Sequence, residues 1–271
     1  MKTHSQGCLN YLLIFHLALV SPVIAWAAPI SQIPLLMSEE LDERNGMIPL
    51  APEIAELLQY VETAARIKFD IRRYPWKRAV TNAENGEGLI FGISKTPERL
   101  RHFTFSAPVI SDAAWLVTNC VAKFPFSSLH DLQGKTIGIV RGTSYGNEFD
   151  RQSNVLFRVE DDTNSNSARL QKLSLKRTDA IIIYNNSLRR EELEAVINQQ
   201  YRASKEGSTH SIGNATMFCV LPKPVSVLDV HFAIRPDRDK GIIRKLNAAI
   251  VRGRRNGDLA RISSKHADKA Q

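Results

Sequence analysis

The feature that most constrains the fold is an alternation of short apolar runs with helical patterns in the first ninety residues. Apolar runs at 33–37 and 89–93 have the length and composition of buried strands, and residues 67–71 alternate between apolar and charged as a strand does. Between them, apolar residues recur at helical spacing over 54–65, and residues 78–87 form a second helical pattern. Strands that alternate with helices predict a mostly parallel sheet with helices on its faces.

The second half of the chain repeats this alternation. Strands are expected at 136–140, 155–159, 180–184, 215–221 and 230–234, and helices at 147–152, 165–173 and 242–250. Pro222 and Pro224 interrupt the pattern between the last two strands. The 271 residues, 43% of them hydrophobic, suffice for one large domain or for two lobes with proper cores.

The charge of the chain gives little support for nucleic-acid or metal binding. The formal net charge is +8, but the basic residues are scattered, apart from Arg252, Arg254 and Arg255 near a helix end. This cluster reads as a solvated face that complements the helix dipole. The seven histidines show no close pair at ligand spacing, and no phosphate loop or dinucleotide motif is present. We therefore expect no metal, no cofactor and no nucleic-acid partner.

The N-terminus has the pattern of a secretory signal peptide. Lys2 precedes an apolar core at 11–20, and Ala25 and Ala27 give the small-x-small cleavage pattern. We expect a signal peptide over residues 1–27, cleavage after Ala27 and a periplasmic protein. An uncleaved anchor is the alternative, although the apolar run is short for a membrane span.

A loop that follows the strand at 89–93 carries the strongest indication of a ligand site. Ser94 begins the loop, and Arg99 lies five residues further on, at the mouth of the strand. The planar guanidinium of arginine suits a carboxylate, because its donors match the two carboxylate oxygens. The alternative is an ordinary surface arginine on a loop.

The pattern Ser-x-Thr-x-x-Arg at 94–99, followed by Phe-Ser-x-Pro at 105–108, resembles a motif of periplasmic solute-binding proteins of the polar amino-acid type. Residues 131–144 resemble the strand and ligand loop that open the second lobe of that family. Residues 178–184 resemble its later second-lobe strand, and 74–79 resemble a variant of members whose ligand is unclear. The order and spacing of these segments make the family assignment stronger than any one of them.

The resemblance implies a two-lobed α/β protein of the periplasmic-binding type II fold, each lobe a mostly parallel sheet flanked by helices. Lobe 1 would be discontinuous, formed by 28–117 and 226–271, and lobe 2 would span 118–225. Two hinge crossings are expected, near 117–120 and near 224–230. Ligands would bind in the cleft at the strand ends, and the lobes would close over them.

By the same resemblance, Arg99 grips the carboxylate of the ligand, and Ser94 adds hydrogen bonds. Thr143 and Ser144 of the facing lobe would begin a helix, whose N-terminus favours an anion. Trp76 would supply an aromatic wall, or else be a core tryptophan.

Other positions leave the ligand open. Arg78 would either reach the cleft or lie on a helix surface. Amino-acid binders place an acidic residue where this chain has Tyr184, and a tyrosine cannot neutralise an ammonium group at neutral pH. Glu39, Glu40 or Asp42 would remain to contact a cation. A carboxylate other than an ordinary α-amino acid is therefore plausible.

Two cysteines follow the expected cleavage site. A lone pair in an exported chain suggests a disulfide. The resemblance places Cys120 on the strand that enters the second lobe and Cys219 on the strand that leaves it, so we predict a bridge between them. Two reduced, buried cysteines are the alternative.

Two enzymatic alternatives remain. Residues 142–146 match Gly-x-Ser-x-Gly, the nucleophile elbow of α/β-hydrolases, with Ser144 as nucleophile. Its partners would come from Asp179, Asp229, His210 and His231. The other alternative is a dehydratase of cyclic acids on the same fold, with Glu39, Glu40 or Asp42 as the general acid.

The sequence favours neither enzyme, nor a sensor module, over reversible binding without covalent chemistry. We expect a monomer that captures a small carboxylate-bearing, amino-acid-like ligand. It would deliver that ligand to the permease of an ABC-type importer.

Overall fold

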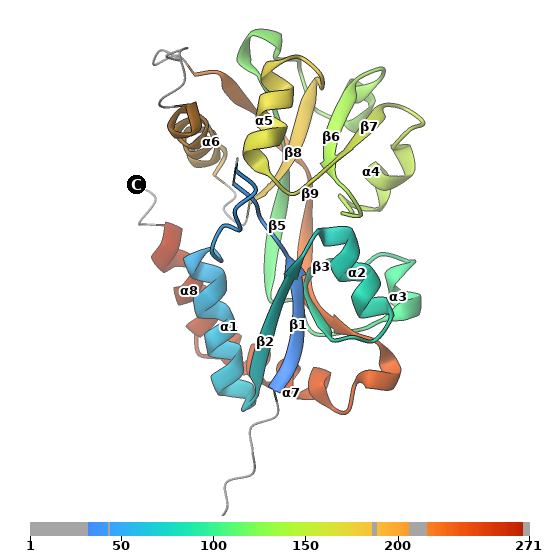
Figure 1. The fold of residues 1–271 in the computed structure, drawn as a ribbon, viewed down its shortest axis with the longest axis vertical. Helices are drawn as coiled ribbons and strands as arrows, with labels where there is room; N and C mark the ends of the chain where they lie inside the picture. Colours follow the sequence, from blue (N-terminus) through green and yellow to red (C-terminus); the bar gives the residue numbers. More distant parts are fainter. Residues whose placement is uncertain (1–31, 43, 186–188, 206–215, 268–271) are drawn as a thin grey trace, which may run out of the picture.

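The computed structural model describes residues 32–42, 44–185, 189–205 and 216–267 (Figure 1). The expected signal peptide and its cleavage site lie outside these residues, as does His210. The described chain forms two α/β halves, one above the other in Figure 1, joined by two long strands.

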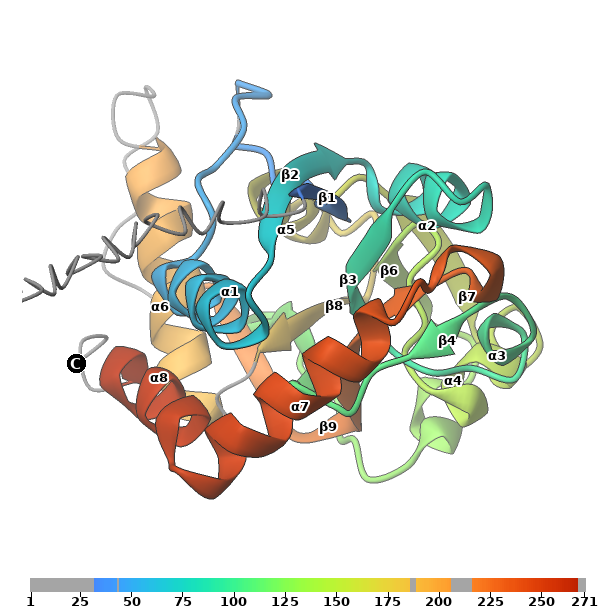
Figure 2. The ribbon, with the colours of Figure 1, turned by 90° about the horizontal axis from the view of Figure 1, so that it is seen from below.

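The first half is built on three parallel strands in the order β2–β1–β3. They are β1 (Gln32–Ser38), β2 (Lys68–Tyr74) and β3 (Leu89–Ile93). The longer helices of this half are α1 (Pro52–Ala65), α2 (Trp76–Glu84), α7 (Ile242–Arg255) and α8 (Asp258–Ala267). Helices α1, α7 and α8 contact one another on one side, as Figure 2 shows from below.

Helix α1 shows how the sequence sets these elements. Proline is tolerated in the first turn, where its missing N–H has no intrahelical partner, and Pro52 stands there. Leu57, Leu58 and Val61 are buried at helical spacing against the sheet. The helix ends at Arg66, which adopts the left-handed conformation with φ 53°. The predicted helix over 54–65 is confirmed.

The second half has the parallel order β8–β6–β7. Its strands are β6 (Thr136–Val140), β7 (Arg158–Asp162) and β8 (Ala180–Asn185). Its helices are α4 (Asn147–Gln152), α5 (Asn166–Ser174) and α6 (Arg190–Lys205). Short 3₁₀ helices lie at Cys120–Ala122, Leu129–Leu132 and Pro236–Arg238.

Two expectations for this half are corrected. The strand expected at 155–159 begins only at Arg158, because the chain turns at Asn154 with φ 60° and leaves Val155 79% exposed. Helix α6 was not expected, although Leu193, Ile197 and Tyr201 are buried at a spacing of four residues.

Two antiparallel strands connect the halves, β5 (Ile110–Asn119) and β9 (Phe218–Ile234). In the described residues they complete one path, β2–β1–β3–β9–β5–β8–β6–β7. The short strand β4 (Thr104–Phe105) pairs with β9, and the short helix α3 (Arg99–His102) precedes it. The α/β fold is confirmed, with a mixed sheet whose parallel parts are joined by antiparallel crossings.

The prediction that the prolines divide two strands is wrong, because β9 continues through both of them. Pro224 lies opposite Trp115, and the register of the β5–β9 ladder shifts on both sides of Trp115. A proline has no N–H to donate to a ladder, so it is accommodated where the ladder is already irregular.

The buried side chains form two clusters in each half. Those of the first half come from residues up to Val109 and from Val230 onward. Those of the second half lie between Ala113 and Leu221. Packing therefore changes from one half to the other along β5 and along β9.

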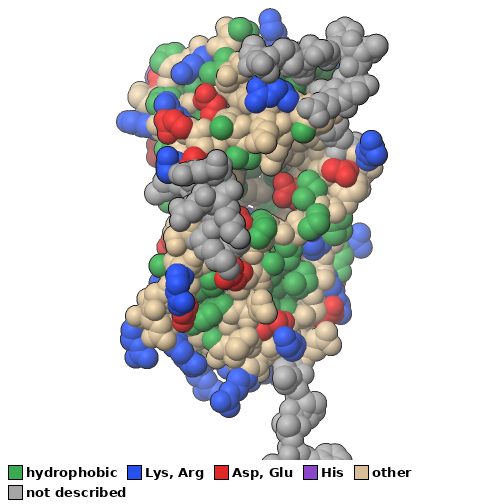
Figure 3. All heavy atoms as spheres, turned by 90° about the vertical axis from the view of Figure 1, so that its left-hand side faces the viewer, with side chains coloured by type: hydrophobic (Ala, Val, Ile, Leu, Met, Phe, Trp, Pro, Cys, Tyr) green, Lys and Arg blue, Asp and Glu red, His purple; other side chains and the backbone are tan. Residues whose placement is uncertain are grey.

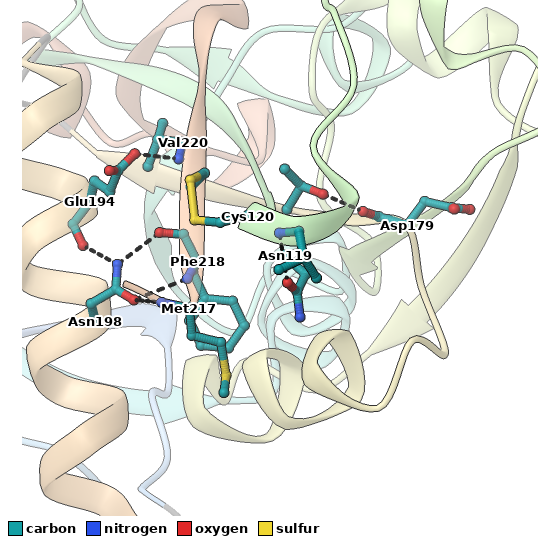
Figure 4. The surroundings of a disulfide bond; sticks show 11 residues. Asn119, Cys120, Asp179, Glu194, Asn198, Met217, Phe218 and Val220 are labelled. Atoms are coloured by element: carbon teal, nitrogen blue, oxygen red, sulfur yellow. Dashed lines mark hydrogen bonds between the residues drawn. A yellow bond between two sulfur atoms is a disulfide. The ribbon is translucent and has the colours of Figure 1, made fainter. Parts of the chain in front are cut away.

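A disulfide joins the two crossings at their far end. Cys120, just after β5, is bonded to Cys219 near the start of β9, with the Cα atoms 5.0 Å apart (Figure 4). The predicted bridge is confirmed. Beside it, Asn198 of α6 donates to the carbonyl of Phe218 at 2.8 Å and accepts from the same residue's amide at 3.0 Å. Both α6 and the disulfide thus fix the start of β9.

Candidate ligand-binding site

A cavity of about 330 Å³ is lined by residues from both halves. Figure 3 shows the molecule hollowed between its halves, with acidic and hydrophobic side chains at the opening. The charged residues of the lining are Glu40, Arg73, Arg99, Asp112 and Arg169. Of the seven site residues expected from the sequence, six line the cavity: Ser94, Arg99, Trp76, Thr143, Ser144 and Tyr184.

Arg99 is held in place by contacts to both halves. It begins α3 and is only 8% exposed. Its Nη1 donates to the carbonyl and hydroxyl oxygens of Ser94 at 3.0 and 3.2 Å, and its Nη2 donates to the carbonyl of Gly142 at 3.1 Å. Burial lowers the pKa of the guanidinium, and within the described chain no carboxylate lies at salt-bridge distance. The cavity thus contains a buried cation without a counter-ion.

The carbonyl of Gly142 receives two donors from the first half. Besides Arg99, the indole Nε1 of Trp76 donates to it at 3.1 Å. Gly142 follows β6 with φ +79°, a conformation that favours glycine. A Cβ there would lie 3.0 Å from the Cβ of Lys77 in α2, so the halves approach closely at this point. We call this group the Gly142 contact.

A second group of hydrogen bonds joins the halves at another edge of the cavity. The side-chain amide of Asn164 donates to the hydroxyl of Ser38 at 2.9 Å and to the carbonyl of Glu39 at 2.7 Å. The amide of Leu41 donates back to the carbonyl of Asn164 at 3.2 Å. We call this group the Asn164 contact.

The loop that holds Thr143 and Ser144 differs from the expected helix start, because α4 begins only at Asn147. The Thr143 amide donates to the Val140 carbonyl at 3.0 Å, which closes a turn. The Ser144 hydroxyl donates to the carboxylate of Asp150 at 2.5 Å. A ligand would therefore meet the Ser144 hydroxyl as an acceptor unless this bond rearranges.

The arrangement does not support Ser144 as a hydrolytic nucleophile. None of His231, Asp179 and Asp229 lines the cavity. His231 is buried with Nδ1 2.9 Å from the carbonyl of Ser106, and Asp179 accepts a hydrogen bond from the Thr136 amide. None of these three residues therefore serves as a partner of Ser144, whose hydroxyl donates to Asp150 instead.

Tyr184 closes one wall of the cavity and stays uncharged. Its hydroxyl donates to the carbonyl of Ser144 at 2.5 Å, and its ring stacks on Tyr145 at 5.2 Å. Burial holds the pKa of Tyr184 well above its ordinary value, with a further rise from nearby Tyr145 and acidic groups. It provides no negative charge for a ligand ammonium group.

Trp76 and Arg78 lie on the same helix but differ in position. Trp76 is 7% exposed, packs with Leu36 and Ile90, and lines the cavity, so it serves both the core and the wall. Arg78 is exposed, does not line the cavity, and places its guanidinium 5.4 Å from the centre of the Tyr74 ring.

Of the three acidic residues considered for a cation, only Glu40 lines the cavity. Burial raises the pKa of its carboxyl, and the charge of Arg73 partly offsets that rise. The side chain of Asn166 donates to it at 3.4 Å. Asp42 instead accepts the amides of Arg44 and Gly46 in a surface turn.

Three charged residues of the lining were missed in the sequence: Arg73, Asp112 and Arg169. Arg73 of β2 donates from Nε to the carbonyl of Ser38 at 3.2 Å. Arg169 of α5 is 2% exposed and donates from Nη2 to the carbonyls of Gly138 and Ile182 at 3.1 and 2.5 Å, so it joins the helix to β6 and β8. Asp112 of β5 faces the cavity, and burial raises the pKa of its carboxyl to about 6.

The described residues contain neither a cluster of metal ligands nor a membrane-spanning helix. No group of three or more histidine, cysteine, aspartate and glutamate side chains is placed to hold a metal ion. None of the described helices has the length and apolar character needed to cross a membrane.

Two α/β halves, two crossings and a cavity between them define the class of type II periplasmic binding proteins. The chain belongs to the bacterial extracellular solute-binding proteins, family 3, whose family model matches residues 53–269. No curated protein matches the chain.

Solved structures of similar fold include binding proteins of transport systems and a sensor domain. A periplasmic binding protein of an arginine transport system from Legionella pneumophila is 20% identical, with a TM-score of 0.65 over 87% of this chain and 99% of that one. AbpA of Streptococcus pneumoniae, an amino-acid ABC transporter substrate-binding protein bound to L-arginine, is 15% identical, with a TM-score of 0.62 over 89% and 95%. A histidine kinase sensor domain is 15% identical, with a TM-score of 0.67 over 87% and 96%.

Proposed function

We propose that this protein captures a small carboxylate-bearing, amino-acid-like ligand in the cavity between its halves and releases it unchanged to an ABC-type importer. The observation that carries the proposal is the state of Arg99. Three hydrogen bonds to protein acceptors leave about two of its five N–H groups available. A buried guanidinium without a carboxylate partner is costly, and a ligand carboxylate would provide that partner.

The other expected site residues take supporting roles in this proposal. Ser94 orients Arg99 and would share the anion, while Trp76 and Tyr184 would enclose the body of the ligand. Thr143 and Ser144 would bound the ligand from the second half. Arg78 would join only if its side chain moved from Tyr74 into the cavity.

The division into lobes is part of the same proposal. We assign 28–117 and 226–271 to lobe 1 and 118–225 to lobe 2. Ala113, Trp115 and Val117 already pack with the second half, which supports a first crossing a few residues earlier than 117.

The family supports a proposal for the location and the membrane partner of the protein. We propose export to the periplasm after cleavage at Ala27, action as a monomer, and a permease partner in the inner membrane. Among its structural neighbours are arginine-binding proteins, so L-arginine is the first compound to test.

A thermal-shift screen of the mature protein tests the ligand class. The panel holds L-arginine, other amino acids, opines, dicarboxylates and aromatic acids. A ligand at a hundred times its Kd adds about 2.7 kcal/mol to the free energy of unfolding. We expect Arg99→Ala to abolish the shift, and Arg101→Ala, an exposed arginine of the same short helix, to preserve it.

Two other results would contradict parts of the proposed function. Unchanged binding in Arg99→Ala removes the carboxylate site. Chemical conversion of a bound compound would indicate a cleft enzyme, and Glu40 would then be the acid to replace.

A further inference from the structure

The cavity contains one carboxylate that the described protein leaves without a partner. Asp112 lies on β5, where side chains alternate between the two faces of the strand. Its neighbour Ser111 faces outward and donates to the exposed Asp229 at 2.7 Å. Asp112 instead lines the cavity together with Ile110 and with Leu228, its partner in the ladder.

Asp112 differs in this from Glu40, the other acid of the lining. Glu40 accepts a hydrogen bond from Asn166 and feels the charge of Arg73. For Asp112, burial is the sole influence on the carboxyl pKa, and no hydrogen bond or ion pair reaches its side chain within the described chain. The side chain of Asp112 is partly buried, so its unpaired carboxylate carries a desolvation cost that a cationic group of the ligand would offset.

The cavity lining contains a cationic group, Arg99, and an anionic group, Asp112, that are not paired with each other. Tyr184 lies near enough to both that each charge affects its pKa, in opposite directions. Arg99 and Asp112 do not affect each other in this way. Arg99 and Asp112 thus line the same cavity as Tyr184 without pairing with each other, which leaves both charges for a ligand that carries two opposite charges.

We propose that Asp112 binds a cationic nitrogen of the ligand while Arg99 binds its carboxylate. The ligand class is then a carboxylate that also carries an ammonium or guanidinium group. Asp112 supplies the negative charge that Tyr184 lacks, from a crossing strand and not from the end of β8. This inference rests on the proposed function and adds a requirement to it.

Four six-carbon probes separate the two charges. Hexanoate carries only the carboxylate, L-norleucine adds the α-ammonium group, 6-aminohexanoate adds a distal ammonium group, and L-lysine has both. Titration calorimetry of the full mature protein gives the affinity of each. We expect at least one cationic probe to bind roughly 10- to 100-fold more tightly than hexanoate, the range of a charge-assisted hydrogen bond.

Substitutions then test whether Asp112 causes the tighter binding of the cationic probes. Asp112→Asn keeps the shape and removes the charge, so the cationic probes should fall to the affinity of hexanoate while hexanoate binding holds or improves. Asp112→Ser serves as a second, smaller variant. Asp229→Asn removes a matched carboxylate one strand away and outside the cavity, and should change none of the affinities.

Each contrary outcome has a distinct meaning. If binding depends on Arg99 but the cationic probes gain nothing over hexanoate, or do not bind at all, the role of Asp112 is rejected and the proposed function stands. If Asp112→Asn weakens all four probes equally, Asp112 is only structural. If no compound of this series or of the wider panel shows Arg99-dependent binding, the proposed function fails and the inference falls with it.

Discussion

The Gly142 contact and the Asn164 contact both join the halves across the cavity, but they use different groups. At the Gly142 contact, the carbonyl oxygen takes donors from Trp76 and from Arg99, the cation that the ligand carboxylate would also use. At the Asn164 contact, a neutral amide bonds to Ser38 and to the backbone of Glu39. If a ligand binds Arg99 as proposed, the first contact is coupled to ligand binding, whereas the second joins the halves through uncharged groups alone.

This difference predicts how the closed arrangement responds to change. A ligand that bonds to Arg99 shares it with Gly142, so an alteration there should affect both closure and recognition. An alteration at Asn164 should shift closure alone, and all ligands should respond by a similar factor.

The largest effect is expected for Gly142→Ala. The new Cβ would lie 3.0 Å from the Cβ of Lys77, and displacing the loop would disturb both bonds to the Gly142 carbonyl. We expect roughly a 100-fold loss of affinity, about 2.7 kcal/mol at 1.4 kcal/mol per tenfold change. Titration with the ligand that the thermal-shift screen identifies measures it.

Gly134→Ala is the matched control. Gly134 also has a positive φ, of +73°, but nothing lies within 4 Å of a Cβ added there. It should lower the free energy of unfolding through backbone strain and leave affinity unchanged. Equal losses of affinity in both variants would show that strain, and not the approach of the halves, controls binding.

The next effect concerns the charge inside the cavity. Burial raises the pKa of Asp112 from 3.8 to about 6, so the folded protein binds the proton more tightly than the unfolded chain. The free energy of unfolding should therefore fall as pH rises from about 4 to about 6. The full difference corresponds to about 3 kcal/mol, and solvent in the cavity reduces it to about 1–2 kcal/mol.

Asp112→Asn removes this dependence. In ligand-free protein the variant should be more stable than the wild type at pH 7.5, and the gain should vanish near pH 4. Chemical denaturation at a series of pH values measures it, with the exposed Asp229→Asn as control. A gain that persists at pH 4 would assign the effect to packing instead of charge.

The smallest effect is expected for Asn164→Ala. It removes two hydrogen bonds between the halves, each contributing about 1 kcal/mol or less. We expect affinities for all ligands to fall by about fivefold with their ranking unchanged.

Asn247→Ala is the control for that loss, since Asn247 accepts from the Ala107 amide within one half. It should cost stability and not affinity. A change of ranking in Asn164→Ala would place Asn164 among the residues that recognise the ligand.

Much of the fold could be predicted because several of the parallel strands are short and largely apolar, although β2 and β7 are rich in charged residues. The runs at 89–93 and 136–140 coincide with β3 and β6. The two crossing strands, β5 and β9, could not be predicted from local apolar runs. The prolines of β9 are tolerated only because the opposite strand shifts register at Trp115, and that depends on a partner about a hundred residues away.

The site was predictable to the extent that local motifs carry it. Arg99 and Ser94 stand five residues apart in one loop, and both line the cavity. Asp112 and Arg169 gave no local signal. An aspartate in a strand looks exposed until β5 pairs with β9 and turns it inward, and an arginine in a helix looks solvated until strand carbonyls surround it.

The continuity of β9 has a mechanical consequence. The 17-residue strand β9 belongs to both halves, and it pairs with β5 to form a two-stranded antiparallel ribbon between them. The disulfide links the two strands covalently at one end of this ribbon, so β5 and β9 cannot slide past each other there. Opening of the cavity would then require the two strands to bend, and we expect the bend at Trp115 and Pro224, where the register of the ladder shifts.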